Sequence, residues 1–378
     1  MLRALLAAAV LGTVVLTGAP ATAAGCPGPS GPPYPGVPWA QQRLGASQVW
    51  PLTRGRGSTV AVVDSGVSAT HPQLHDAVRG GDNVLDSSSP TRDCVGHGTV
   101  VAGIIAGRGA PGTGFTGVAP DAQIVSVKTL ENVQRAQGAE DQIARGIEAA
   151  ISSGADVINV SAAGYADSPR LAAAVRHASA RDIVVVAAAG NDEQHTGAPM
   201  YPAAYEGVLT VAAITREGAL ADFSAVHSYI EVAAPGEDIV GPAPTGGGYL
   251  TGASGTSFAA PYVAGVAALV RAYYPHMHAA EVVRRITVTA DAPATGSGYG
   301  VVDPYRAVTA VVAAPARRQV AEVVPPRAGD TADPLRDTRI AALTVSAAAV
   351  LLLLGAVLAA AVLPRGHRRA WRPGRITR

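Results

Sequence analysis

The feature that most constrains the fold is a series of short, continuous runs of β-branched and small apolar residues. Runs that are apolar at successive positions are typical of strands buried on both faces of a sheet. Such sheets are mostly parallel, because helices cover both of their faces. The runs lie at residues 59–63, 124–127, 157–160, 183–186 and 208–214.

Helical segments separate these runs. Ile143, Ile147 and Ile151 are spaced four residues apart, which places them on one face of a helix between the second and third runs. The alternation predicts an α/β fold, a doubly wound and mostly parallel sheet with helices on both faces and right-handed crossovers. In such folds the functional residues lie at the carboxyl ends of the strands.

Apolar segments also occur at both ends of the chain. Residues 1–24 combine one arginine, a short apolar core and small residues, which predicts a secretory signal peptide cleaved after Ala23 or Ala24. Ile340–Leu363 contains 24 residues without a charge. A helix of that length reaches about 36 Å and crosses a hydrocarbon core of about 30 Å. We therefore expect one C-terminal transmembrane helix.

The basic tail that follows this segment predicts the orientation in the membrane. Residues 364–378 contain six arginines and no acidic residue. By the positive-inside rule the tail is cytoplasmic, so the large central domain faces outward in a single-pass protein of the cell membrane. The net charge of the whole chain is only +1, so the tail does not indicate nucleic-acid binding.

Composition divides the rest of the chain. Residues 25–38 are too rich in proline and glycine for regular structure and predict a short extension strapped onto the following domain. Residues 39–313 have the composition of one globular domain, and residues 314–339 are polar and interrupted by prolines, as in a linker.

The sequence contains two cysteines, Cys26 and Cys94. Outside the cytoplasm a single disulfide between them is the expected state, and it would stabilise the fold by about 4 kcal/mol in the loop-entropy model. The alternative is lipid attachment at Cys26, which directly follows two alanines and a glycine. Lipidation would duplicate the C-terminal anchor, so we favour the disulfide.

Four polar residues occupy strand ends and helix starts. Asp64 ends the first run and Asn191 follows the fourth, while His97 and Ser257 begin candidate helices in GHGTVVAGIIAG and GTSFAAPYVAG. Each residue alone is equally well explained as a turn residue or a helix cap. Four such residues at these places predict a common site, with Ser254 and Thr256 as supporting turn residues.

These residue types supply the parts of a nucleophilic site. A serine hydroxyl attacks well only when an imidazole removes its proton, and a carboxylate on the other imidazole nitrogen fixes the tautomer and stabilises the cation. The oxyanion that forms at an attacked acyl carbon needs donors. A side-chain amide and a backbone N–H at a helix start can provide them.

In the residues of its motifs, their order and their approximate spacing, the sequence resembles the subtilisin-like serine peptidases. The resemblance covers residues 39–307 and rests on VAVVDSGV, GHGTVVAGIIAG with GVAPDAQIVSVKTL, NVSAAG, AAAGNDE and GTSFAAPYVAGVAALV. It implies a subtilisin-like fold. On the matching positions it implies Asp64 as the orienting carboxylate, His97 as general base and acid, Ser257 as nucleophile and Asn191 as oxyanion donor.

The resemblance also implies a substrate cleft for a protein or peptide. One wall would be formed by Ser161, Ala162, Ala163 and Gly164, along which an extended substrate adds as a strand. Ala162 and Ala163 stand where family members often have a larger residue or glycine. The side-chain preference at the cleaved bond is therefore not transferred from the family.

A narrower resemblance is to the mycosins, the subtilisin-like peptidases of actinobacterial type VII secretion. It rests on the signal peptide, the short extension, the proline-rich linker, the single anchor and the short tail, and it implies type VII membrane components as partners. Only 40 positions separate residue 24 from Asp64, which leaves no room for a separately folded inhibitory propeptide. In that family the extension wraps the domain without blocking it, and a Cys26–Cys94 bridge would pin it close to His97.

Three other signals are interpreted as structural. Gly112, Gly114 and Gly117 fit a dinucleotide fingerprint but follow a helix instead of a strand, so no cofactor is expected. His71 and His75 have the spacing of a zinc pair, but they lack the glutamate and include Pro72, which predicts a surface turn and a hydrogen-bonded histidine. No loop rich in aspartate has calcium-ligand spacing, and we expect no metal.

The sequence thus predicts a membrane-anchored, extracytoplasmic serine endopeptidase associated with type VII secretion. The alternatives are a structural subunit of the secretion complex in which proteolysis is secondary, and a general membrane-tethered subtilase.

Overall fold

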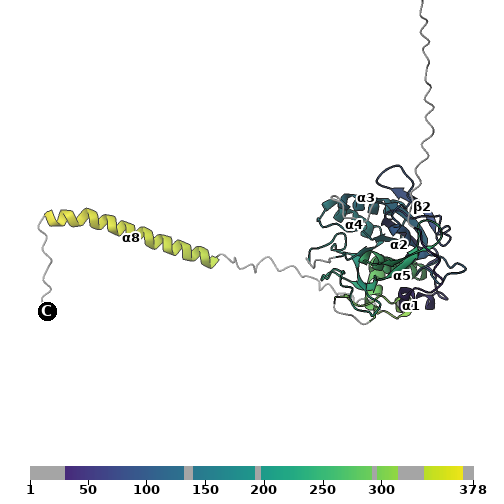
Figure 1. The fold of residues 1–378 in the computed structure, drawn as a ribbon. Helices are drawn as coiled ribbons and strands as arrows, with labels where there is room; N and C mark the ends of the chain where they lie inside the picture. Colours follow the sequence, from purple (N-terminus) through teal and green to yellow (C-terminus); the bar gives the residue numbers. More distant parts are fainter. Residues whose placement is uncertain (1–29, 132–138, 192–196, 292–295, 314–335, 369–378) are drawn as a thin grey trace, which may run out of the picture. The chain divides into compact units, whose positions relative to one another are not determined.

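A seven-stranded parallel sheet forms the centre of the chain's first unit. The structure is a computed structural model that describes residues 30–131, 139–191, 197–291, 296–313 and 336–368, in two units that divide after Ala313. Figure 1 shows the sheet enclosed by helices. In pairing order its strands are β2 (Val78–Asn83), β3 (Gln123–Lys128), β1 (Thr59–Asp64), β4 (Val157–Val160), β5 (Val184–Ala188), β6 (Val208–Ile214) and β7 (Val232–Pro235).

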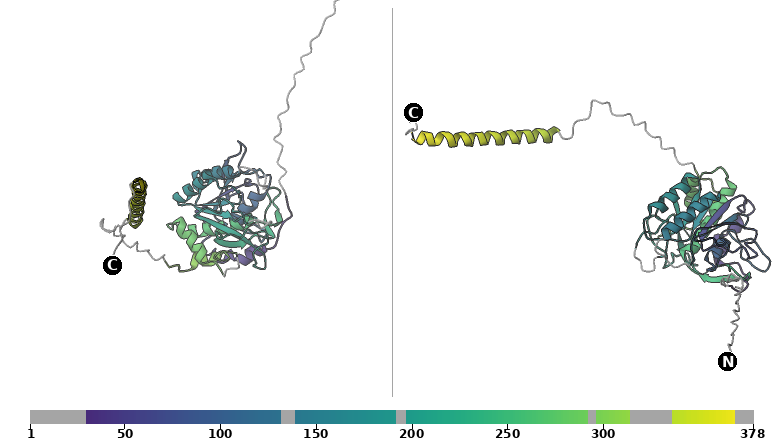
Figure 2. Two further views of the ribbon diagram at one scale, coloured as in Figure 1. Left: turned by 90° about the vertical axis from the view of Figure 1, so that its left-hand side faces the viewer. Right: turned by 90° about the horizontal axis from the view of Figure 1, so that it is seen from above.

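Helices cover both faces of this sheet, which confirms the doubly wound α/β prediction (Figure 2). Val60 and Val62 of β1 pack with one set of helices, while Ala61 and Val63 belong to the core on the opposite face. The first face is covered by α2 (His97–Ala106) and α5 (Thr256–Tyr273), and the second by α3 (Ala139–Ser152) and α4 (Pro169–Ala180).

The remaining elements of the first unit surround this centre. They are α1 (Trp39–Leu44), the 3₁₀ helix η1 (Ala46–Gln48), α6 (Ala279–Val288), α7 (Pro304–Thr309) and an antiparallel hairpin of β8 (Ile239–Pro242) and β9 (Tyr249–Ala253).

All five predicted runs form strands, but the two edge strands β2 and β7 were not predicted. β2 has the sequence VRGGDN and no fully buried residue, so it lacks the apolar signal of the central strands. A Cβ atom at Gly81 would lie 1.8 Å from the carbonyl oxygen of Ser126. Glycine therefore permits the close approach by which this polar strand pairs with β3.

The described part of the N-terminal extension, from Ser30 onward, contacts the domain. The carbonyl oxygen of Pro32 accepts a hydrogen bond from the Tyr249 N–H at 3.0 Å, and that of Tyr34 accepts one from the Thr113 hydroxyl at 2.8 Å. The rings of Tyr34 and Tyr249 lie 6.2 Å apart. These contacts hold the extension against β9 and the loop after α2.

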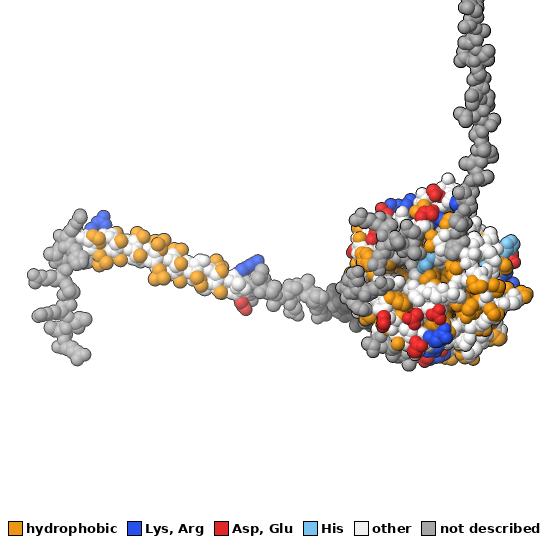
Figure 3. Space-filling view, viewed as in Figure 1, with side chains coloured by type: hydrophobic (Ala, Val, Ile, Leu, Met, Phe, Trp, Pro, Cys, Tyr) orange, Lys and Arg blue, Asp and Glu red, His pale blue; other side chains and the backbone are white. Residues whose placement is uncertain are grey.

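The second unit contains helix α8 (Arg336–Arg368). Its segment Asp337–Arg365 has 29 residues and a mean hydropathy of 2.6, and it is long and apolar enough to cross a membrane. Figure 3 shows hydrophobic side chains along the helix and basic ones near its two ends. The predicted signal peptide and most of the linker lie outside the described residues.

Candidate active site

Asp64 and His97 meet at the carboxyl end of the central strand β1. Asp64 is the last residue of β1 and is fully buried, and His97 is the first residue of α2. The two oxygens of Asp64 lie 2.8 and 2.9 Å from His97 Nδ1. Since a buried carboxylate accepts at this distance, His97 carries its proton on Nδ1 and leaves Nε2 as the acceptor.

Ser257 completes a chain of hydrogen bonds through His97. Its Oγ lies 2.9 Å from His97 Nε2. Helix α5 begins at Thr256, with Gly255 as N-cap residue. Ser257 therefore stands in the first turn of the helix without capping it, which refines the expectation that it is the helix start.

The surroundings of His97 favour a defined ring position and a raised pKa. The ring of Phe258 packs against the imidazole at 4.7 Å between centroids, and the His97 side chain is 11% exposed. Burial lowers the pKa of His97, but the charge and hydrogen bond of Asp64 and the charge of Asp93 outweigh it, so the pKa lies above its ordinary value. The surroundings of His97 thus favour its protonated imidazole.

Asn191 is held against the start of α5 by Thr256. Its Oδ1 accepts hydrogen bonds from the Thr256 N–H at 3.0 Å and from the Thr256 hydroxyl at 2.9 Å. The same hydroxyl accepts from the N–H of Gly190 at 3.1 Å. Because Oδ1 faces Thr256, the Nδ2 donor points to the other side. Thr256, predicted only as a turn residue, orients this amide.

Gly255 leaves open the space between the amide and the nucleophile. A Cβ atom at this position would lie 3.0 Å from Ser257 Oγ and 3.2 Å from Asn191 Nδ2. The backbone of Gly255 has a φ of +153°, which favours glycine. The space bordered by the serine hydroxyl and an amide donor is where the oxygen of an attacked carbonyl group can be received.

The four predicted wall residues follow strand β4 and take different roles. Ser161 Oγ accepts from Asn159 Nδ2 at 2.8 Å and donates to the Ser257 carbonyl oxygen at 2.9 Å, so it braces the first turn of α5. Gly164 exchanges both backbone hydrogen bonds with Tyr201, at 2.9 and 2.8 Å. Ala162 and Ala163 are partly exposed between them.

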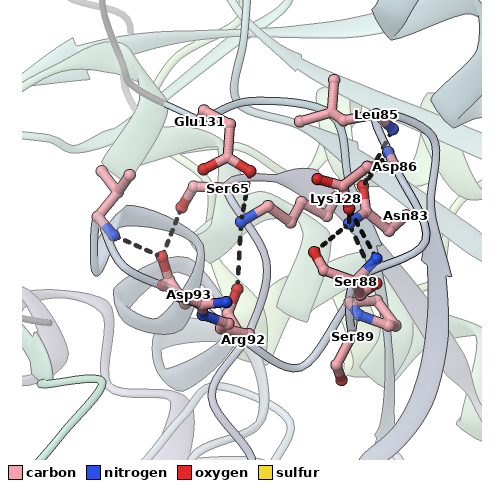
Figure 4. Close-up of polar contacts among 12 residues, drawn as sticks. Ser65, Asn83, Leu85, Asp86, Ser88, Ser89, Arg92, Asp93, Lys128 and Glu131 are labelled. Carbon is pink, nitrogen blue, oxygen red and sulfur yellow. Dashed lines mark hydrogen bonds and ion pairs between the residues drawn. The ribbon is translucent and has the colours of Figure 1, made fainter. Parts of the chain in front are cut away.

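A second buried carboxylate, Asp93, lies beside the site and was not predicted from the sequence. It is 4% exposed and accepts from the Ser65 hydroxyl at 3.0 Å and from the Thr99 hydroxyl at 2.6 Å. Figure 4 shows Asp93 next to Ser65 and Arg92. Burial raises the pKa of Asp93, while the hydrogen bonds from Thr99 and from the Gly96 N–H oppose this rise. Only its position, four residues before His97, could have identified Asp93 from the sequence.

The residues interpreted as structural lie apart from this arrangement. His71 is buried, not at the surface, and its ring bonds to the Gly248 carbonyl oxygen at 3.2 Å and the Gln73 N–H at 3.2 Å. The Gly112–Gly117 loop follows helix α2, as predicted. Among the described residues no group of three or more His, Cys, Asp or Glu side chains could hold a metal ion. Cys26 lies outside the described residues, so its pairing with Cys94 stays a prediction.

The fold and this arrangement define a serine peptidase of the subtilase class. Residues 55–319 match the subtilase family, Peptidase S8. The chain therefore belongs to that family and is a subtilisin-like serine peptidase.

Among characterised relatives it is similar to the mycosins. Mycosin-3 of Mycobacterium tuberculosis is 36% identical over 408 residues, which cover 88% of this chain and 85% of that protein. Thermitase of Thermoactinomyces vulgaris is 38% identical over 64% of this chain and 85% of its own. The solved structure of MycP3 protease from the type VII (ESX-3) secretion system has a TM-score of 0.66 and 33% identity, covering 74% of this chain and 91% of that one.

Proposed function

We propose that this subtilase cleaves peptide bonds by an acyl-enzyme mechanism in which Ser257 is the nucleophile. The observation that carries the proposal is the unbroken chain of hydrogen bonds from Asp64 through His97 to Ser257, at 2.8 and 2.9 Å. His97 Nε2 takes the hydroxyl proton as Oγ bonds to the acyl carbon of the scissile peptide. Asp64 holds the imidazole in the required tautomer and stabilises its cation.

The next steps use the same groups. The negative oxygen of the tetrahedral intermediate is stabilised by Asn191 Nδ2 and by the Ser257 N–H in the first turn of α5. The C–N bond then breaks, and His97 returns its proton to the departing amine. Water, deprotonated by His97, then attacks the acyl carbon; the acyl C–Oγ bond breaks, His97 returns the proton to Ser257 Oγ, and the second product leaves.

The substrate in this proposal is an extended segment of a protein. Ala162 and Ala163 follow strand β4 past its carboxyl end, directly after Ser161, whose hydroxyl donates to the Ser257 carbonyl oxygen at 2.9 Å. An extended peptide that pairs with this edge presents a single carbonyl group to the nucleophile. The two alanines contribute only methyl groups to the wall, which favours recognition through the backbone.

We further propose that the enzyme acts outside the cytoplasm as a single-pass protein and works with type VII secretion components. Support comes from the apolar segment Asp337–Arg365, from the arginines that follow it, and from the similarity to the mycosins. A signal peptide at residues 1–24 and a linker at 314–339 complete this arrangement. The competing proposal is a structural subunit of the secretion complex, favoured by the same similarity.

Replacing Ser257 with alanine separates these two functions. In cells that carry the Ser257→Ala variant in place of the natural protein, the peptidase proposal predicts that processing of its protein substrate stops. Secretion and complex assembly that survive in the variant would show two separate functions. Unchanged processing would contradict the proposed peptidase role of Ser257. If no secretion component co-purifies with the detergent-extracted protein, the type VII role is contradicted, while the peptidase proposal is not affected.

A further inference from the structure

The first turn of α2 carries His97 but contains no capping side chain of its own. Its N-cap residue is Gly96, and no side-chain cap hydrogen bond is present there. The first N–H groups of a helix lack intrahelical acceptors and must bond elsewhere when they are buried. His97, the proposed general base, therefore lies at a helix start whose backbone N–H groups need hydrogen-bond acceptors from outside the helix.

Asp93 supplies two of these acceptors, for the N–H groups of Gly96 and Thr99. Its Oδ1 accepts from the N–H groups of Val95 at 3.1 Å and Gly96 at 2.8 Å, and its Oδ2 accepts from the N–H of Thr99 at 3.0 Å. With the hydroxyls of Ser65 and Thr99, five donors converge on this carboxylate. A carboxylate at the positive end of a helix is also favoured by the helix dipole.

Ser65 joins Asp93 to the catalytic carboxylate. Its N–H donates to Asp64 Oδ1 at 2.7 Å, while its hydroxyl accepts from the Gly98 N–H at 3.0 Å and donates to Asp93 Oδ1 at 3.0 Å. The N–H groups on both sides of His97 are thus fixed, that of Gly96 by Asp93 and that of Gly98 by Ser65. Asp64 and Asp93 hold His97 through its ring and through its backbone, respectively.

The loop that carries Asp93 is itself anchored to strand β3. The buried ammonium of Lys128 donates to the Arg92 carbonyl oxygen at 3.3 Å and pairs with Glu131 at 3.3 Å (Figure 4). The Ser126 hydroxyl donates to the Pro90 carbonyl oxygen at 2.7 Å. These bonds fix the backbone directly before Asp93, so the carboxylate has little freedom to move.

We propose that Asp93 is a positioning residue of the catalytic site: it orients the first turn of α2, and with it His97, for proton transfer from Ser257, and its charge supports the imidazolium. This inference rests on the catalytic roles proposed above. A cap that served stability alone would hold the helix without altering catalysis. Asp93 differs because its negative charge is buried beside the imidazole, where electrostatic effects are strong.

The charged groups around the start of α2 come from three neighbouring segments. The first turn of α5 presents Ser257 and Phe258, which carry no charge. The charged side chains of β1, of the loop before α2 and of the end of β3 are Asp64, Asp86, Arg92, Asp93, Lys128 and Glu131. Lys128 is balanced by its pair with Glu131. Removing the charge of Asp93 therefore leaves Asp64 as the main support of the His97 cation.

The test uses the full-length protein in detergent and the variant Asp93→Asn, with Asp86→Asn as the matched control. Asp86 lies in the same loop but is fully exposed, where its carboxylate accepts from Ser88 and Asn83. The pH dependence of kcat and KM is measured on a chromogenic peptide, with active sites counted by a fluorophosphonate. For Asp93→Asn we expect kcat to fall by about tenfold to a hundredfold, as for a small misplacement of a catalytic group. KM changes little and the acid limb of kcat/KM moves to lower pH, while Asp86→Asn keeps the wild-type profile.

A wild-type kcat and acid limb in folded Asp93→Asn would overturn the proposal. Should that variant fail to fold, Ser65→Ala decides, because it keeps both carboxylates and removes the hydroxyl that links Asp93 to the Gly98 N–H. A lower kcat at unchanged KM and acid limb supports the proposal, and a wild-type kcat refutes it.

The two proposals fail differently. Absence of any Ser257-dependent turnover or labelling in the wild type contradicts the proposed function. The NMR titration of His97 then still tests Asp93: a lower midpoint in Asp93→Asn supports its effect on the imidazolium, and an unchanged midpoint overturns it.

Discussion

Replacing Thr256 with valine removes one hydroxyl and leaves the shape of the side chain nearly unchanged. Thr256 is 1% exposed, and its hydroxyl donates to Asn191 Oδ1 at 2.9 Å and accepts from the Gly190 N–H at 3.1 Å. In Thr256→Val the buried Gly190 N–H loses this acceptor, which costs about 1–3 kcal/mol of the free energy of unfolding. The variant should therefore melt at a lower temperature than the wild type.

The effect on catalysis follows from the number of bonds that hold the amide. Asn191 Oδ1 loses one of its two bonds to Thr256 and keeps the one from the Thr256 N–H. Complete loss of one oxyanion donor lowers kcat by about 10²–10³ in subtilisin. With half of the support retained, we expect kcat to fall by about tenfold, which is about 1.4 kcal/mol of transition-state stabilisation.

The assay is hydrolysis of a chromogenic peptide under saturating conditions, with kcat and KM determined separately and active sites counted by titration. Thr256→Ser is the matched control, because it keeps the hydroxyl and is expected to retain a kcat near the wild-type value. A lower melting temperature with an unchanged kcat in Thr256→Val would refute the reasoning, since it would show that the hydroxyl supports the fold alone.

Three further outcomes are expected. On the acid side, kcat/KM should reach half of its maximum above pH 6.5, because the pKa of His97 is raised above 6.5 and only the neutral imidazole is a base; a midpoint below that pH would count against the described site. Gly255→Ala should lower kcat by about 10² or more, as for misplacement of a reacting group, because its methyl group would lie 3.0 Å from Ser257 Oγ; wild-type turnover would contradict this. Peptide mapping without reductant should recover Cys26 and Cys94 in one cross-linked peptide, and a lipidated Cys26 would contradict the predicted disulfide.

Central strands could be predicted because burial on two faces leaves a strong signal in the sequence. The segment Val157–Val160 is apolar at nearly every position and forms β4 with the predicted bounds. The edge strand β2 could not be predicted, since its polar residues face solvent and its pairing depends on the approach of Gly81 to Ser126. That approach is a tertiary contact between distant segments.

The same distinction applies to the site. Asp64, His97, Asn191 and Ser257 could be chosen because a reaction requires those side chains at strand ends and helix starts, and the structure brings them together. The residues that orient them left a weaker signal. Thr256 resembles an ordinary turn residue, and the action of Asp93 depends on Ser65, which belongs to a different segment of the chain.

The most direct test of the account is the site of reaction with a fluorophosphonate, measured by intact-protein and peptide mass spectrometry. The account predicts one adduct, located on Ser257 and absent in Ser257→Ala, with labelling strongly slowed in His97→Ala. Adduct formation that persists in Ser257→Ala, or a wild-type protein that remains unlabelled while folded, would contradict the assignment of Ser257 as the nucleophile.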